Sequence, residues 1–272
     1  MIRSTELRTY CFESYGVSVR IESNSGEILD AAVRQARSAL LGNLREIDCN
    51  KSEQVFTLNV DEDGICRTVQ NGRLMVADKA GANYWHFFDG LVRLLVADFA
   101  PSAVFVHAGV VGWRGKAIVI PGNSFQGKTT LVAELVKCGA EYYSDEYAVI
   151  DETGLVSPYA RKLSIRTNGE TIREDPIDVR DFGGVIGTTP IPVACVLFTR
   201  YEHESAPIFQ IMSPGQGIVG IIAQTIGIRR FSEFRIKVLK NALSDAIIVK
   251  SPRPDAGIFA RDFLEFVDNT AI

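Results

Sequence analysis

Residues 117–139 read AIVIPGNSFQGKTTLVAELVKCG, and this stretch decides the fold. The apolar run Ala117–Ile120 predicts a short buried strand, and residues Thr129–Lys137 predict a helix that ends before a capping glycine, Gly139. Between strand and helix, residues 122–129 match the pattern G-x-x-x-x-G-K-[ST]. A strand, a glycine-rich loop and a helix in this order form a phosphate-binding loop.

The backbone and two side chains account for the chemistry expected of this loop. Successive N–H groups surround a phosphate, and the helix N-terminus adds partial positive charge. We expect Lys128 to bridge the β- and γ-phosphates and the Thr129 hydroxyl to ligate Mg²⁺. A glycine-rich turn that binds nothing is the alternative. The candidate nucleotide-binding residues are Gly122, Asn123, Ser124, Phe125, Gln126, Gly127, Lys128, Thr129 and Thr130.

The residues before the loop indicate the kind of sheet. Residues 103–112 predict a strand, and only four residues separate it from the loop strand. Because parallel strands need a crossover of about a dozen residues, we predict an antiparallel hairpin and a mixed sheet. With Arg114-Gly115 as the two-residue turn, His107 lies opposite Gly122. His107 is therefore expected beside the phosphate site; a histidine that only packs within its strand is the alternative.

An acidic pair, Asp145 and Glu146, follows Lys128 by 17 and 18 residues, within residues 141–151 that read as a strand. Neighbouring strand residues point to opposite faces, so both acids can face a nucleotide only at a strand end or a bulge. One of them is expected to hold Mg²⁺, and the other to accept a proton from an acceptor hydroxyl. An exposed acidic strand face is the alternative.

These features together resemble the catalytic domain of HPr kinase/phosphorylase and its shorter relatives, the HPr-kinase-related kinases, whose core is similar to that of phosphoenolpyruvate carboxykinase. The resemblance covers roughly residues 85–230. It rests on matching spacings: His107 precedes Lys128 by 21 residues, and the acidic pair follows at the family distances. It implies a kinase that uses ATP and Mg²⁺ to phosphorylate a hydroxyl.

The resemblance also implies roles for individual side chains. Asp145 would be the base toward a serine hydroxyl, assisted by Glu146, and both would take part in metal binding with Thr129. His107 would support the phosphate site. Arg200 would match an active-site arginine that stabilises transferring charge, an arginine paired on the surface being the alternative.

Three residues depart from the family pattern. Phe125 replaces a loop glycine, Ser164 stands where a metal-binding glutamate is expected, and Gln216 replaces the arginine after Pro-Gly. The last two positions serve phosphorolysis or metal binding in the bifunctional enzymes, so they argue against phosphorylase activity. Two alternatives stay open: a nucleotide-binding regulatory module without phosphotransfer, and an ATPase that uses water as the acceptor.

Composition narrows the class of protein. The chain has 272 residues, a net charge of −4 and 46% hydrophobic residues, which is typical of a globular protein and gives no electrostatic basis for binding nucleic acid or membranes. The expected partners are a nucleotide and a hydroxyl acceptor on a small protein, a peptide or a small molecule; homo-oligomer formation is left open.

Five cysteines without a CxxC spacing predict reduced thiols and a cytoplasmic protein: Cys11, Cys49, Cys66, Cys138 and Cys195.

Two domains are expected, a small α+β domain over residues 1–84 and an α/β phosphate-loop domain of HPr kinase type over residues 85–272. The first should contain a hairpin at Asn71-Gly72. The remaining predicted elements are strands over 17–21, 55–60, 65–69 and 73–76 and helices over 27–41, 81–99, 231–243 and 255–268.

Overall fold

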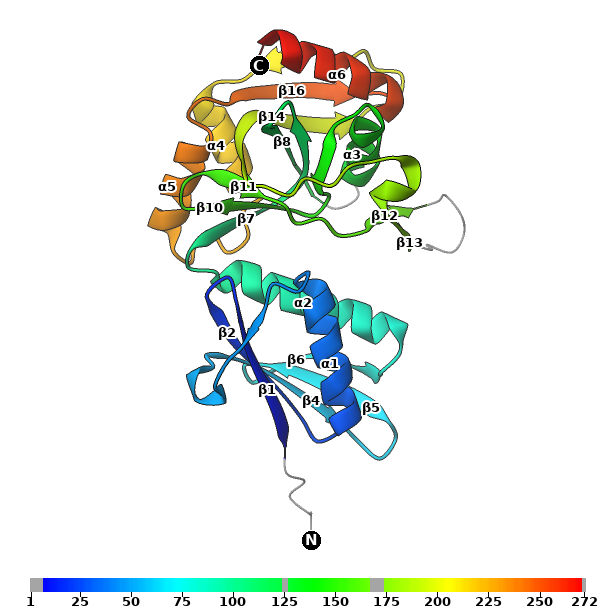
Figure 1. Ribbon diagram of the computed structural model, residues 1–272, viewed down its shortest axis with the longest axis vertical. Helices are drawn as coiled ribbons and strands as arrows, with labels where there is room; N and C mark the ends of the chain where they lie inside the picture. The colour runs from blue at the N-terminus through cyan, green and yellow to red at the C-terminus, as the bar shows by residue number, and fades with distance from the viewer. Residues whose placement is uncertain (1–6, 124–126, 167–173, 271–272) are drawn as a thin grey trace. The chain divides into compact units, whose positions relative to one another are not determined.

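The computed structural model describes residues 7–123, 127–166 and 174–270 (Figure 1). The chain divides into two compact units, Met1–Ser102 and Ala103–Ile272. The boundary therefore lies after Ser102. The sequence predicted it after residue 84. Helix α2 (Ala82–Phe99), which was assigned to the second domain, packs against α1 (Gly26–Ala39) of the first unit.

The first unit is a sheet with the strand order β3-β1-β2-β4-β5-β6, accompanied by α1 and α2. Ser25 caps α1 by accepting a hydrogen bond from the Ile28 amide, as its position suggested. The predicted hairpin turn at Asn71-Gly72 is present, with φ angles of 47° and 82°. The strands are β1 (Arg8–Ser14), β2 (Val17–Ser23), β3 (Arg45–Glu46), β4 (Gln54–Val60), β5 (Ile65–Gln70) and β6 (Arg73–Lys79).

The expectation that all five cysteines are reduced is wrong. A disulfide joins Cys11 on β1 to Cys49 at the start of a 3₁₀ turn, η1 (Cys49–Lys51), and 38 residues separate the two. The other three cysteines are free thiols. Spacing rules for neighbouring cysteines could not find this pair, because the ladder between β1 and β3 brings them together. The cysteine-based reason for expecting a cytoplasmic protein is thereby removed.

The second unit is built on the predicted mixed sheet, with the order β11-β10-β7-β8-β14-β16-β15 and with β9 also on β7. Strands β8, β14 and β16 are parallel to one another, and β7 is antiparallel to β8. The strands of this sheet are β7 (Ala103–Trp113), β8 (Lys116–Pro121), β9 (Glu141–Ser144), β10 (Tyr147–Asp151), β11 (Leu155–Ser157), β14 (Ile191–Tyr201), β15 (Gln210–Ile211) and β16 (Ile247–Arg253).

The β7–β8 hairpin has the register predicted from its turn. Trp113 pairs with Lys116 and Ala108 pairs with Pro121, so Arg114 and Gly115 form the two-residue turn. Both turn residues have positive φ, 50° and 76°, the backbone that a tight hairpin requires. The hairpin thus fixes the position beside β7 from which the chain enters the predicted phosphate-binding loop.

Helices cover both faces of this sheet (Figure 1). Helices α3 (Lys128–Lys137) and α6 (Ala256–Thr270) pack together over one face, around buried residues such as Leu131 and Phe263. Helices α4 (Pro214–Ile222) and α5 (Ser232–Ala242) cover the other, around Ile221 and Leu239. The predicted helices over 231–243 and 255–268 are confirmed. A separate hairpin and a 3₁₀ turn complete the unit: β12 (Leu163–Arg166), β13 (Glu174–Ile177) and η2 (Val179–Phe182).

None of the helices in the described part of the chain is both long and apolar enough to cross a membrane.

Candidate functional site

Strand β8 and helix α3 flank the predicted loop, as expected from the sequence. Helix α3 begins at Lys128, immediately after Gly127, whose φ of 74° is in the left-handed region that favours glycine. At the other end, the Gly122 amide donates a hydrogen bond to the His107 carbonyl oxygen at 3.2 Å, the pairing that the hairpin register predicted. Ser124, Phe125 and Gln126 lie outside the described residues.

Lys128 is buried, with 8% of its surface exposed, and its ammonium group contacts the backbone at the start of the loop. Its Nζ donates hydrogen bonds to the carbonyl oxygens of Gly122 at 2.8 Å and Asn123 at 2.7 Å. Burial lowers the pKa of Lys128 to about 8, and the nearby carboxylate of Asp145 opposes that change. The structure therefore holds a poorly solvated cation at the start of a helix, where an anion would be favoured.

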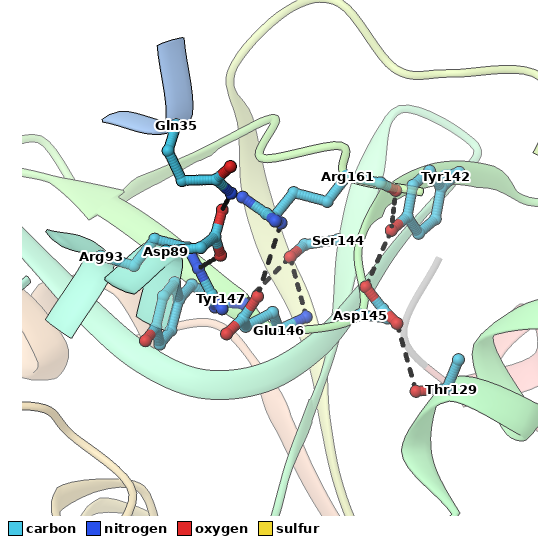
Figure 2. Close-up of polar contacts among 10 residues, drawn as sticks. All are labelled: Gln35, Asp89, Arg93, Thr129, Tyr142, Ser144, Asp145, Glu146, Tyr147 and Arg161. Atoms are coloured by element: carbon cyan, nitrogen blue, oxygen red, sulfur yellow. Dashed lines mark hydrogen bonds and ion pairs between the residues drawn. The ribbon is translucent and has the colours of Figure 1, made fainter. Parts of the chain in front are cut away.

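Asp145 lies between Thr129 and Tyr142 (Figure 2). The Thr129 hydroxyl donates to Asp145 Oδ2 at 3.1 Å, and the Tyr142 hydroxyl donates to Oδ1 at 3.0 Å. Tyr142 also lies 2.7 Å from the carbonyl oxygen of Arg161. Burial raises the pKa of Asp145, while the bonds from Tyr142 and Thr129 oppose the rise. A half-buried carboxyl group is thus held directly against the first turn of α3.

The acidic pair sits at an interruption of the strand, as the alternation of strand side chains required. Strand β9 ends at Ser144 and β10 begins at Tyr147, both paired with β7. The Ser144 hydroxyl accepts hydrogen bonds from the amides of Glu146 and Tyr147 and so shapes the break. Glu146 is directed toward Arg161, with 3.8 Å between the charged groups (Figure 2). Asp145 is thus the member of the pair that bonds to Thr129 of α3.

His107 lies on the face of β7 that carries α3. Strand residues two apart share a face, and Val111 belongs to the buried cluster formed with that helix. Gly109, between them, has no room for a side chain, because a Cβ there would lie 2.6 Å from Val132 Cγ2 of α3. The His107 ring lies 6.4 Å from that of Tyr147, centroid to centroid. The strand thus places His107 near the loop, while its chemical role stays a prediction.

Thr129 and Asp145 suit one corner of a magnesium site. Mg²⁺ binds six oxygens at about 2.0–2.1 Å, so neighbouring ligands lie roughly 3 Å apart. The 3.1 Å between Thr129 Oγ1 and Asp145 Oδ2 matches that separation. No group of three or more metal-ligating side chains of the His, Cys, Asp or Glu type occurs within the described ranges. Phosphate oxygens and water would have to complete the shell, as is usual for Mg²⁺.

Three other residues singled out in the sequence lie apart from this group. The side chain of Arg200 is exposed on β14, where its backbone pairs with Pro252. Ser164 is exposed on β12. Gln216 is used locally, because its side chain accepts a hydrogen bond from the Ser213 amide and completes the capping box of α4. The role of Arg200 stays a prediction.

A pocket of about 400 Å³ opens beside the loop and was not predicted from the sequence. Arg253, at the end of β16, is 3% exposed and lines it. The Arg253 Nη2 atom would lie 2.3 Å from a Cβ on Gly127, so a side chain at position 127 would displace the guanidinium group. The other lining residues are Thr130, Glu134, Tyr201, Asp255, Ala256 and Gly257.

Comparisons with known proteins give a distant likeness to solved structures. No protein-family model matches the chain, and no curated protein matches it. Among solved structures, the "Structure of the Hpr(Ser) kinase/phosphatase from Coxiella burnetii" is similar, at 17% sequence identity and a TM-score of 0.33, over 61% of this chain and 94% of that chain. We infer neither an activity nor a ligand from a likeness at this level, and family membership stays a prediction.

Proposed function

We propose that the protein is a phosphotransferase that uses ATP and Mg²⁺ to transfer the γ-phosphate to a hydroxyl group. A serine of a small protein or peptide is the favoured acceptor, and a small-molecule hydroxyl is the second choice. The observation that carries the proposal is the contact between Thr129 and Asp145, which puts a carboxyl group 3.1 Å from the first turn of the loop helix.

The described residues support each part of such a reaction. Lys128 Nζ now donates to two neutral carbonyl oxygens, and phosphate oxygens would be stronger, charged acceptors for the same group. Thr129 and Asp145 would hold Mg²⁺, which would neutralise charge on the transferring phosphate. Asp145 would also orient or deprotonate the acceptor hydroxyl, since a γ-phosphate on a magnesium ion held by Thr129 and Asp145 would lie next to this carboxyl group.

The test is phosphate transfer from γ-labelled ATP to components of a host-cell extract, followed by identification of the labelled species. Wild-type protein should label a hydroxyl acceptor. Lys128→Met should lose both nucleotide binding and labelling, whereas Asp145→Asn should bind ATP and lose labelling. Glu152→Gln, at an exposed turn after β10, is the matched control for an acid-to-amide change and should label like wild type.

The same assay separates the two alternatives. ATP binding without label transfer or phosphate release would indicate a regulatory nucleotide-binding module. Rapid phosphate release with no acceptor present would indicate an ATPase. Full labelling activity in Asp145→Asn would contradict the role given to that carboxyl group.

A further inference from the structure

The pocket beside Arg253 lies at the edge of the sheet where an α/β protein binds ligands. Strands β8, β14 and β16 are parallel, and they end at Pro121, Tyr201 and Arg253. In open α/β sheets, ligands bind outside the carboxyl ends of such strands. The volume of about 400 Å³ is within the range of small-molecule pockets, roughly 300–1,000 Å³.

The pocket and Asp145 lie on different sides of the first turn of α3. Thr130 and Glu134, four residues apart, present one side of the helix to the pocket. Thr129 contacts Asp145, and successive helix residues point about 100° apart. A polyphosphate held by the loop would therefore have its reacting end at Asp145 and its other end at the pocket.

The end of the pocket next to the loop is cationic. The Arg253 guanidinium group lies against Gly127 and 5.4 Å from the centroid of the Tyr201 ring. A planar guanidinium group matches the geometry of phosphate oxygens. Burial lowers the pKa of Arg253, with Tyr201 and Asp255 opposing the change. Because desolvating this cation costs free energy, an anion bound beside it would offset part of that cost.

Two carboxylates, Glu134 and Asp255, also line the pocket, and they make different contacts. Asp255 Oδ1 accepts hydrogen bonds from the amides of Gly257 and Ile258 and so caps α6. Glu134 Oε1 accepts from Lys137, while its Oε2 lies 3.4 Å from the position of a Cβ on Gly257, at the pocket wall. A carboxylate at this place repels phosphate and accepts hydrogen bonds from ribose hydroxyls.

We propose that this pocket holds the nucleoside end of the nucleotide, with Arg253 on the phosphate nearest the ribose and Glu134 on the ribose 2′-hydroxyl. The protein then selects ribonucleotides over 2′-deoxyribonucleotides. This inference rests on the proposed function, since it takes the loop to bind a nucleotide. Beyond that function, it states which side of α3 the nucleoside occupies and that Arg253 and Glu134 recognise the nucleotide.

The first test is calorimetric titration with MgATP and with its 2′-deoxy analogue. Wild-type protein should bind MgATP about tenfold more tightly than the deoxy analogue, the expected effect of one charge-assisted hydrogen bond. Glu134→Gln should lose most of this preference, mainly by weakening MgATP. Arg253→Met should weaken both nucleotides about equally, by tenfold or more, and Arg253→Lys should weaken them less. Equal affinities of wild type for the two nucleotides would overturn the role of Glu134.

A steric test does not depend on the charged residues. Gly257 is the second residue of α6, so Gly257→Leu would place a side chain into the pocket from a helical position that accepts leucine. The matched control is Gly215→Leu at the second residue of α4, where a Cβ has no atom of the described residues within 4 Å. Gly257→Leu should bind neither nucleotide, and Gly215→Leu should bind both like wild type. Thermal unfolding in the absence of nucleotide would show whether each variant is folded.

The outcomes separate this inference from the proposed function. If wild type binds MgATP, Lys128→Met does not, and both Gly257→Leu and Arg253→Met bind like wild type, the pocket assignment is wrong and the proposed function stands. If wild type does not bind MgATP at all, both fail.

Discussion

At the scale of single residues, the candidate site depends on charges kept out of water. Lys128 is buried and Asp145 is half-buried, and their pKa values move in opposite directions, the first lowered and the second raised. Burial disfavours the charged form of either group. The protein thus retains costly groups at a site where an anion and a metal ion would stabilise them, which is the pattern expected of functional residues.

Lys128 should make the stability of the nucleotide-free protein depend on pH. Its pKa is about 8 when folded and 10.5 when unfolded, so the unfolded state binds more protons between these values and stability rises with pH. Compared with Lys128→Met, wild type should gain on the order of 1–2 kcal/mol of unfolding free energy from about pH 7.5 to about pH 9.5. Urea unfolding of both proteins at both pH values measures this difference. A pH-independent difference would show that the ammonium group is better solvated than the structure indicates.

The hydroxyl group of Tyr142 should affect the pKa of Asp145. Its hydrogen bond lowers the pKa of the carboxyl group, so Tyr142→Phe should raise that pKa. Since Asp145 must be ionised to accept a proton, the acidic limb of the pH–rate profile for phosphotransfer should move to higher pH, with little change in KM for ATP. Tyr143→Phe is the control, because the Tyr143 hydroxyl donates to the Thr189 carbonyl oxygen instead. Identical acidic limbs in the two variants would contradict the coupling.

Residues of the candidate site could be predicted where a short spacing in the sequence determines their position. A two-residue turn fixes the hairpin register, and that register put His107 opposite Gly122. The acidic pair was found by its distance from Lys128. Arg253 was not found, because it follows the loop by more than a hundred residues, in no recognisable motif, and reaches Gly127 only through the pairing of β14 with β16.

At the scale of elements, the position of α3 depends on how closely it approaches β7. Gly109 permits that approach, with Val132 Cγ2 only 2.6 Å from the position of a Cβ and the Cβ of Lys128 at 3.9 Å. The helix that carries Lys128 can therefore pack this closely on β7 because Gly109 has no side chain. The sequence indicated both elements but not this contact, which depends on packing between them.

Gly109→Ala should consequently destabilise the protein by about 1–3 kcal/mol, because valine is stiff and the helix would have to move. In Gly109→Ala/Val132→Ala the overlap is relieved, so the double variant should be more stable than the sum of the single changes by about 1 kcal/mol. Denaturant unfolding of the four proteins measures this coupling. Gly90→Ala on α2 is the control, since a Cβ there would make an ordinary contact with Arg93 Nη2 at 3.9 Å and no loss of stability is expected. Strict additivity would contradict the close contact.

At the scale of the whole molecule, the order of the strands was the hardest feature to predict. The β5–β6 and β7–β8 hairpins were recognised from their turns, whereas β1 and β3 were not recognised at all. The parallel pairs β2–β4 and β14–β16 join segments far apart in the chain, and local patterns carry little information on such pairings. The unit boundary was misplaced for the same reason, since the packing of α2 on α1 decides it.

The disulfide between Cys11 and Cys49 in the first unit can be tested by thiol labelling. Under denaturing, non-reducing conditions, a thiol reagent should label the three free cysteines, Cys66, Cys138 and Cys195, and should label five after reduction. Closing a loop of 38 residues restricts the unfolded chain, so Cys49→Ser should lower stability by about 2–4 kcal/mol. Its affinity for MgATP should not change, because every residue of the candidate site lies in the second unit. Cys138→Ser, at a half-buried free thiol, is the control for the loss of one cysteine. Labelling of all five cysteines without reduction would show that Cys11 and Cys49 are not bonded, and would restore the expectation of reduced thiols.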